Sequence, residues 1–372
     1  MAEEIIDKII DECRKFAVNE IREPSLRADL SSDTDWVVRV WEKSGQLGLP
    51  FLPIPEYFDG AACSPLECAL ILDLLAEECA GIASVYAHHF TACIALLMAD
   101  DNHQKRFSPD HTDKKGLPVI FSVIFPQESN DNSLWCIKNN DHLIIKGTSQ
   151  ITGGIVLADG FVMFLNDARD LDKLYCLWVD RSAKGVTTGE PLQLPGLKVT
   201  TFGRLHFDDA VIAHENIIAC GQTAPKMLRA AQSIYYGFIG ALAIGAARGA
   251  FQKAMKYAKE RYQFGKQIVQ HQEIQRMLGT MHVNITVGTA AYRQAFEDQR
   301  VKFSFVVPEA ISAKIFCTDA AIEIAMDAIQ IHGGYGYMHE YGIEKIMRDV
   351  KMLQLLGGTN PFLEVHQIAD NI

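Results

Sequence analysis

An uncharged stretch of 18 residues constrains the fold of this chain more than any other feature. The stretch "AAQSIYYGFIGALAIGAA" (residues 230–247) contains no Asp, Glu, Lys or Arg, and its length reaches the lower limit for a membrane span. It also contains Gln232, Ser233 and three glycines, so it is only moderately apolar. A helix that is apolar on all sides is buried, either in lipid or in the core of a protein. We therefore expect a helix buried inside a bundle.

The residue pattern changes twice along the chain. In residues 1–117, apolar side chains recur at three- and four-residue steps, which predicts helices. Residues 118–225 form short runs rich in β-branched and aromatic residues, separated by Gly, Asn and Asp, and this pattern is typical of strands. Long helical patterns return in residues 226–372 and favour a bundle. The sequence thus predicts an α+β protein with three domains in the order α, β, α.

Composition narrows the functional class. The net charge of −11 argues against nucleic acid or an anionic membrane as a main partner. Nine dispersed cysteines without a CxxC pair indicate reduced thiols in a cytoplasmic protein. The amphipathic N-terminus is not typical of a signal peptide. The segment "DHTD" (residues 110–113) has no accompanying cluster of ligands, so we interpret it as a solvated turn rather than a metal site.

Three stretches in the last third of the chain suggest chemistry. They are "ERYQFGKQIVQHQEIQ" (260–275), "QIHGGYGYMHEYGIEKIMRD" (330–349) and "LLGGTN" (355–360). A glycine cluster at a helix end exposes backbone N–H groups that suit phosphate or pyrophosphate. Arg261 adds a fixed cationic fork. Taken singly, the glycines could be a plain helix cap and the arginine a surface charge.

The order and spacing of these stretches resemble the acyl-CoA dehydrogenase family. That family carries "ERxxFGxxIxxxQ", "QIxGGxGY" and "MRDxKxxQIxEGT" segments. Two further stretches, "GQLGLPFLPIPEYFDG" and "HFDDAVIAHENIIA", resemble its N-terminal signature and the end of its β domain. The resemblance implies an N-terminal helical domain, a central β-barrel-like domain and a C-terminal four-helix bundle.

The resemblance also implies a bound FAD. The positions that match FAD contacts in the family are Arg261, Phe264, His271, Gln330, Ile331, His332, Gly333, Gly334, Thr359, Asn360 and Thr152. The first three match positions that hold the FAD of a neighbouring subunit, so a dimer of dimers, a homotetramer, is implied. Gly358 matches a substrate position.

The catalytic acid of the family is missing. In the family, a glutamate removes the α-proton of an acyl thioester while hydride leaves the β-carbon for the flavin. Its usual position is Gly357 here, and its alternative position on the uncharged helix is Tyr235. A family arginine that steadies the thioester falls at Tyr236. The resemblance therefore leaves the proton-transferring group unassigned.

The sequence also differs from the family pattern at the positions that surround the flavin ring. The loop usually written "TEPGAGSD" reads "IFPQESND" (124–131), and "WIT" reads "QIT", with Gln150 in place of the tryptophan. Thr152 survives. The outer part of the FAD site is thus better preserved than the part around the isoalloxazine.

Three side chains are candidates for a substitute base. Tyr235 ionises only at about pH 10 unless a cation or flavin lowers its pKa, and a buried tyrosine with a bonded hydroxyl is the commoner situation. His88 and His89 fall where family members line the acyl cavity, and a histidine supplies a base near neutral pH. Because neighbouring side chains point in different directions, at most one of the pair should face the site.

Three functions remain in competition. The first is an FAD-dependent dehydrogenase that acts, with a relocated base, on an acyl thioester of CoA or of an acyl carrier protein. The second is a non-oxidative elimination of the desulfinase kind, which needs no α-proton removal. The third is a non-catalytic subunit in a heteromer with an active relative. For the first function, the resemblance implies an electron-transferring flavoprotein as the electron acceptor.

Overall fold

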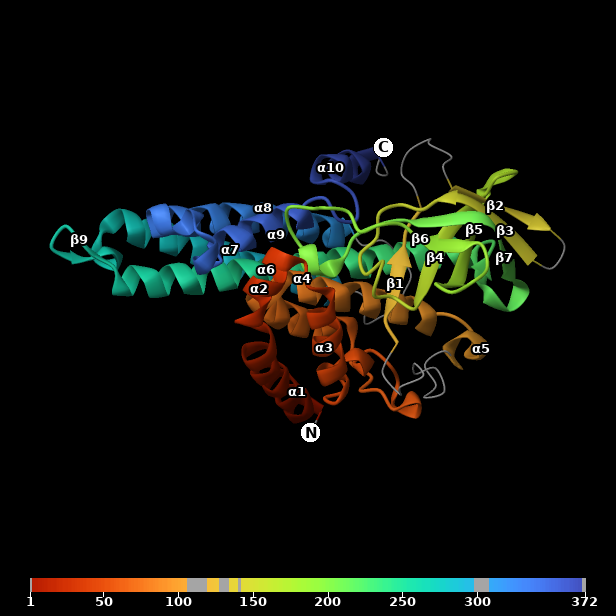
Figure 1. Cartoon of the computed structure of the whole chain (residues 1–372), viewed down its shortest axis with the longest axis horizontal. Helices are drawn as coiled ribbons and strands as arrows, with labels where there is room; N and C mark the ends of the chain where they lie inside the picture. The colour runs from red at the N-terminus through yellow and green to blue at the C-terminus, as the bar shows by residue number, and fades with distance from the viewer. Residues whose placement is uncertain (1, 106–118, 127–133, 140–141, 298–307, 370–372) are drawn as a thin grey trace.

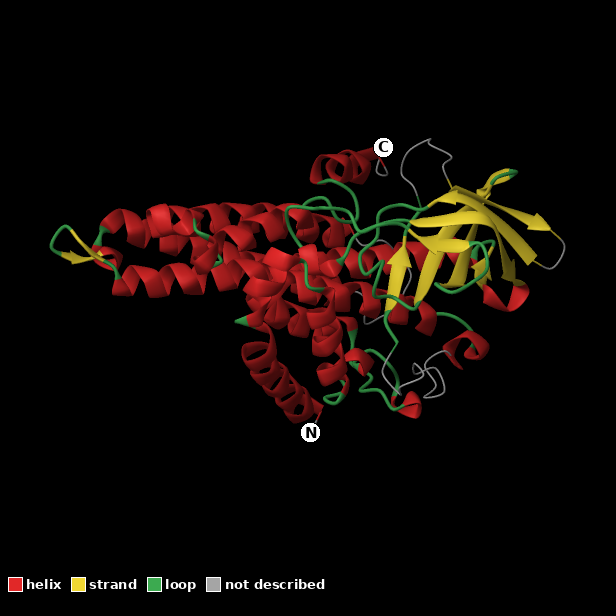
Figure 2. Ribbon diagram, viewed as in Figure 1, coloured by secondary structure: helices red, strands yellow, loops and turns green. Residues whose placement is uncertain are grey.

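The computed structural model describes residues 2–105, 119–126, 134–139, 142–297 and 308–369. Its elements follow the order α, β, α (Figure 1). The β sheet lies at one end of an elongated molecule and the helical bundle extends to the other end, with the N-terminal helices beside the middle of the bundle (Figure 2). The predicted order of the three parts is confirmed. The loop residues 127–131 and the segment 110–113 lie outside the described residues.

The N-terminal part is helical and is built around one long helix. Its elements are α1 (Ala2–Phe16), the π-helical turn η1 (Ala17–Ile21), α2 (Pro24–Ser31), α3 (Thr34–Gly45), the 3₁₀ turns η2 (Leu49–Phe51) and η3 (Glu56–Phe58), α4 (Pro65–Leu97) and α5 (Asp101–Gln104). A capping box starts α4, because the Ser64 hydroxyl accepts from the Glu67 N–H and the Glu67 carboxylate accepts from the Ser64 N–H. This cap fixes the start of the helix that carries His88.

The central part is a mixed sheet of eight strands in the order β6-β7-β3-β2-β4-β5-β8, with β1 paired to β4. The strands are β1 (Phe121–Ile124), β2 (Leu134–Asn139), β3 (His142–Thr148), β4 (Gly160–Asp167), β5 (Asp170–Asp180), β6 (Val186–Thr188), β7 (Leu205–Ala213) and β8 (Ile217–Cys220). Strand β1 pairs in parallel with β4 and leads into the junction with the helices. The turn at residues 152–154, before β4, reaches the same junction.

The C-terminal part is the bundle. It contains α6 (Thr223–Glu260), α7 (Gln272–Glu297), α8 (Pro308–His332), α9 (Ile343–Leu353) and α10 (Asn360–Ala369). The hairpin of β9 (Tyr262–Gln263) and β10 (Lys266–Gln267) forms the tip of the bundle that lies farthest from the sheet (Figure 1). The uncharged stretch lies in α6, which packs against α4, α7, α8 and α9. That helix is long and apolar enough to cross a membrane, but 89% of its most apolar window is buried inside the protein, as predicted.

Glycines allow α6 to approach α4 closely. A Cβ atom on Gly245 would lie 2.0 Å from the carbonyl oxygen of Asp73, and one on Gly249 would lie 2.3 Å from that of Glu77. Both distances are shorter than any real carbon–oxygen contact, so the two helices touch through their backbones at these positions. The contact places Arg248, between the two glycines, beside the carboxylates of Asp73 and Glu77.

The "MRD" motif joins the bundle to the β domain. The Asp349 carboxylate accepts from the Leu197 N–H at 2.7 Å and from Lys345 Nζ at 2.5 Å. The Arg348 guanidinium donates to the Pro195 carbonyl and, at 2.6 Å, to the Asp29 carboxylate. The motif therefore acts structurally in this chain, because it ties the loop at residues 195–197 and the helix α2 to α9.

We predict that Gly245→Ala destabilises the protein by about 1–3 kcal/mol, because the added methyl group must push α6 away from α4. Gly279→Ala is the matched control, since Gly279 lies on α7 and a Cβ atom there meets nothing within 4 Å. The control should be stabilised by up to about 1 kcal/mol through helix propensity. Urea denaturation of both variants measures the difference, and equal stabilities would show that the close approach is absent.

Candidate functional site

The outer part of the predicted cofactor site forms a cradle at the tip of the bundle. A cavity of about 620 Å³ lies there, between the β9–β10 hairpin and the end of α8. Seven of the predicted FAD contacts line it: Arg261, Phe264, His271, Ile331, His332, Gly333 and Gly334. Gln330 is an exposed residue next to them on α8 and is not part of the lining. The structure therefore brings together residues that are separated by up to 73 positions in the chain (334 − 261).

The cradle suits a dinucleotide phosphate. Arg261 ends α6, its guanidinium lies 5.9 Å from the centre of the Tyr335 ring, and it forms no ion pair with any described residue. A Cβ atom on Gly334 would meet nothing within 4 Å, so the backbone there faces open space. Phe264 is 92% exposed and offers an aromatic face beside His271. A free guanidinium, an accessible glycine backbone and exposed aromatic surface fit the diphosphate and adenosine of FAD.

His332 has a structural place in the cradle wall. Its Nδ1 lies 2.7 Å from the Ala328 carbonyl oxygen, and its ring stacks on Tyr257 with centroids 4.5 Å apart. Burial lowers the pKa of His332. The ring is therefore neutral at pH 7 and donates Nδ1–H within its own helix.

The remaining predicted contacts lie in a second group at the junction of the three domains. Thr152 is buried, and its hydroxyl donates to the Val123 carbonyl at 2.8 Å. Thr359 is exposed, and its Oγ1 accepts weakly from the Phe362 N–H at 3.4 Å, which leaves the hydroxyl hydrogen available. The cradle and this group lie at opposite ends of α9, an 11-residue helix of about 16 Å.

Asn360 is committed to the protein itself. Its amide nitrogen donates to Thr318 Oγ1 at 2.9 Å and to the Asp319 carboxylate at 2.6 Å, and its oxygen accepts from Lys314 Nζ at 2.6 Å. The side chain is buried, so these bonds use its donors and its acceptor. In this conformation Asn360 fixes the turn before α10 and has no free polar atom for a ligand.

Sequence reasoning missed Lys314. This lysine is fully buried on α8, and its Nζ also donates to the carbonyl oxygens of Gln354 and Gly358, at 2.9 and 2.8 Å. These bonds hold the turn that carries Gly357, Gly358 and Thr359. The sequence does contain a sign of its role, because Lys314 lies inside the apolar run "AISAKIF". A lysine buried in such a run requires several hydrogen-bond acceptors around it.

Two tyrosine rings occupy the space where a side chain at position 357 would begin. Gly357 has a φ of +67°, and a Cβ atom on it would lie 2.8 Å from Tyr236 Cε1 and 3.4 Å from Tyr235 Cδ1. Both tyrosines are only 4% exposed. A glutamate introduced at position 357 would therefore first have to displace the Tyr236 ring.

A hydrogen-bonded pair lies next to these rings. The Tyr235 hydroxyl lies 2.9 Å from His88 Nε2, and the Gly153 N–H donates to the same nitrogen at 3.3 Å. His88 Nδ1 lies 2.8 Å from the Ser84 carbonyl oxygen and must carry the ring hydrogen. Nε2 is therefore an acceptor, and Tyr235 donates to it. The pair joins α4, α6 and the β domain.

His89 points to the other side of α4. Its Nε2 lies 3.0 Å from the Pro50 carbonyl oxygen, and its Nδ1 accepts from the Phe121 N–H at 3.0 Å. Both ring nitrogens are thus used to tie α4 to the turn η2 and to β1. Of the two histidines, His88 is therefore the one that contacts Tyr235.

The pKa values of the pair are shifted away from neutrality. Burial lowers the pKa of His88 to about 4 and raises the pKa of Tyr235. At pH 7 the tyrosine therefore holds its proton and the histidine is neutral. In this state neither side chain carries a charge.

We predict that the free energy of unfolding falls as the pH drops from 6.5 toward 4. Burial lowers the pKa of His88 and of His89 from 6.5 to about 4, so in this range the unfolded chain binds protons that the folded chain does not. Each histidine should cost roughly 3 kcal/mol at the acid end, and neither should contribute above pH 6.5.

Denaturant titrations across this pH range measure the effect. His88→Gln should lower stability at pH 7 and flatten the pH dependence by about one proton. His214→Gln, which changes an exposed histidine, is the control and should leave the slope unchanged. If the His88→Gln variant kept the wild-type dependence of unfolding free energy on pH, the lowered pKa of His88 would be contradicted.

We further predict that Gly357→Ala costs about 2–4 kcal/mol, the sum of the left-handed backbone and the contact with the Tyr236 ring. Gly154→Ala is matched to it, because Gly154 has a φ of +71° and a Cβ atom there meets nothing within 4 Å. The control should lose only about 1–2 kcal/mol. Thermal and urea unfolding of both variants separate the two contributions, and equal losses would mean that Tyr236 does not fill this space.

The fold and the cradle define a flavin-dependent oxidoreductase, and comparison with known proteins assigns its family. The acyl-CoA dehydrogenase N-terminal domain matches residues 4–115, and the acyl-CoA dehydrogenase C-terminal domain matches residues 237–372. The chain belongs to the acyl-CoA dehydrogenase family. Members of this family use FAD.

Individual proteins agree with this assignment. The short-chain-specific acyl-CoA dehydrogenase of Clostridium acetobutylicum is 27% identical, over 93% of this chain and 92% of the relative. The 3-(aryl)acrylate reductase of Clostridium sporogenes is 27% identical, over 99% of this chain and 98% of the relative. Among solved structures, the prolyl acyl carrier protein oxidase AnaB is similar with a TM-score of 0.88, at 20% identity and over 98% of each chain.

Proposed function

We propose that this chain transfers hydride and a proton between FAD and an acyl thioester, and that Tyr235 and His88 handle the proton. The observation that carries this proposal is the 2.9 Å hydrogen bond between the Tyr235 hydroxyl and His88 Nε2, next to the space left at Gly357. The family glutamate would occupy that space. A tyrosine hydroxyl held by a histidine is the polar pair that adjoins it.

The geometry favours reduction of an α,β-unsaturated thioester. When bound and reduced, the flavin would supply the hydride. The Tyr235 hydroxyl, which donates to His88 Nε2, would instead give its proton to the α-carbon, and the tyrosinate formed would take a proton back from water. His88 Nε2 keeps the Gly153 N–H as a donor when the Tyr235 hydroxyl turns away, so no buried ring nitrogen is left unpaired. The similarity to an acrylate reductase supports this direction.

The residues at the two ends of α9 support a cofactor site that is shared between chains. The cradle would hold the diphosphate and adenosine, and Thr152 and Thr359 would lie beside the flavin ring of a second FAD. An FAD held by both groups then requires two copies of the chain. We propose a homo-oligomer, the dimer of dimers that the family resemblance implies, in the cytoplasm, with CoA or an acyl carrier protein as the thioester carrier and an electron-transferring flavoprotein as the redox partner.

Anaerobic stopped-flow spectroscopy tests the proposed reaction. Flavin reduced with dithionite should be reoxidised by crotonyl-CoA, with recovery of the yellow absorption. Tyr235→Phe should slow this step by about 10²–10⁴-fold, because it removes the proton donor. Tyr175→Phe, which changes another buried tyrosine, is the control and should react at the wild-type rate. Reoxidation of Tyr235→Phe at that rate would rule out the role of Tyr235.

One alternative has structural support. The burial of Tyr235 and Tyr236 beside Gly357 also fits a non-catalytic subunit whose substrate pocket has closed. Such a chain would bind FAD, leave its flavin unchanged by any thioester in either direction, and purify with a glutamate-bearing relative.

A further inference from the structure

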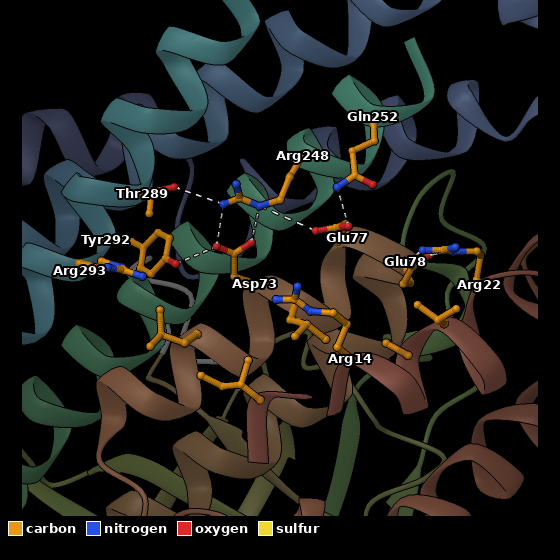
Figure 3. A pocket seen from close by; sticks show the side chains of 15 residues that line it. Arg14, Arg22, Asp73, Glu77, Glu78, Arg248, Gln252, Thr289, Tyr292 and Arg293 are labelled. Carbon is orange, nitrogen blue, oxygen red and sulfur yellow. Dashed lines mark hydrogen bonds and ion pairs between the residues drawn. The ribbon is translucent and has the colours of Figure 1, made fainter. Parts of the chain in front are cut away.

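A second cavity, separate from both parts of the cofactor site, lies between the N-terminal helices and the bundle (Figure 3). Its volume is about 590 Å³, which is within the range of small-molecule sites. Helix α1, the turn η1 and α4 form one side of it, and α6 and α7 form the other. It shares no lining residue with the cradle or with the Tyr235–His88 pair.

The carboxylates in this cavity are already paired. Asp73 accepts from the Tyr292 hydroxyl at 2.7 Å and from Arg248 at 3.1 and 3.4 Å. Glu77 accepts from Gln252 at 2.8 Å, and Glu78 accepts from Arg22 at 2.7 Å. Figure 3 shows these bonds along the floor of the cavity. The negative groups are therefore used within the protein.

Positive donors remain available. Arg14 extends from α1 into the cavity and forms no hydrogen bond or ion pair with a described residue (Figure 3). Within the described part of the chain, Arg248 Nη1 likewise has no partner, although its Nε and Nη2 are bonded. The lining holds four arginines against three carboxylates, in a protein whose net charge is −11. The cavity is thus a locally cationic site on an acidic protein.

An apolar wall lies beside the free guanidinium of Arg14. It consists of Ile10, Ala17, Val18, Leu70 and Leu74, from α1, η1 and α4. Ile10, Ala17 and Val18 lie within four residues of Arg14 in the chain, so one helical segment offers both a cationic and an apolar contact. A ligand that satisfies both has an anionic head and an aliphatic body.

We propose that this cavity binds a small aliphatic carboxylate, with its head on Arg14 and Arg248 and its chain along the wall. A carboxylate matches the planar donor fork of a guanidinium, and the binding would connect α1 to the bundle. The site is independent of the proposed reaction.

Titration calorimetry with hexanoate tests the proposal on the flavin-loaded protein. We expect one saturable site per chain and about tenfold weaker binding by Arg14→Gln. Arg39→Gln is the control, because Arg39 is an exposed arginine on α3 outside the cavity, and it should bind hexanoate as the wild type does. Visible absorption should show equal flavin content in all three proteins, which separates this site from the cofactor site.

A second variant tests the site independently, in case Arg14→Gln does not fold. Val18→Trp places a large ring in the lining of the cavity, at a position that is 36% exposed, and should abolish binding. Hexanol should not bind at the same concentrations. Equal binding of hexanoate by the wild type and Arg14→Gln would overturn the proposal, since the ligand would then occupy the acyl site. Lack of hexanoate binding, with a change of oligomer size in Arg14→Gln, would overturn it in favour of an interface between copies.

Discussion

The direct backbone contact between α6 and α4 is the constraint on which the rest of the structure depends. Gly245 and Gly249 allow these helices to touch, and a helix without charge over 18 residues can then be surrounded by protein instead of water. The same contact sets the relative position of side chains on both helices. At one end it brings Tyr235 to His88, and farther along it brings Arg248 to Asp73. A proton-handling pair and a cationic cavity thus follow from one helix–helix interface.

The surroundings of Gly357 leave little room for a larger side chain. Position 357 adopts a left-handed backbone that suits glycine. Lys314 bonds to the Gly358 carbonyl oxygen in the same turn, and the Tyr235 and Tyr236 rings lie against position 357. These features support one another, because each removes room or freedom that a glutamate would need. A larger side chain at this position would therefore require several of these groups to move together.

The sequence predicts the parts of the structure that depend on local pattern. The α, β, α order and the burial of residues 230–247 follow from periodicity and composition. The assignment of Arg261, Gly333 and Gly334 to an FAD site is implied only by the family resemblance. The parts it does not predict depend on contacts between distant residues. His88 and Tyr235 are 147 positions apart, and Lys314 and Asn360 are 46 apart. The hydrogen-bond partners of Asn360 show that its side chain is used within the protein, and the burial of His88 keeps its ring neutral. Neither the partners nor the burial can be read from the residue type alone.

The bond between Asp349 and Leu197 spans 152 residues and ties the β domain to the last quarter of the chain. Proteins are synthesised from the N-terminus, at about 5–20 residues per second, and their domains generally fold as units. On the ribosome, the loop at residues 195–197 must therefore wait for roughly eight to thirty seconds before its partner is synthesised. Truncated chains that end before α9 would leave this loop without its anchor, so the final docking of the β domain onto the bundle must follow the synthesis of α9.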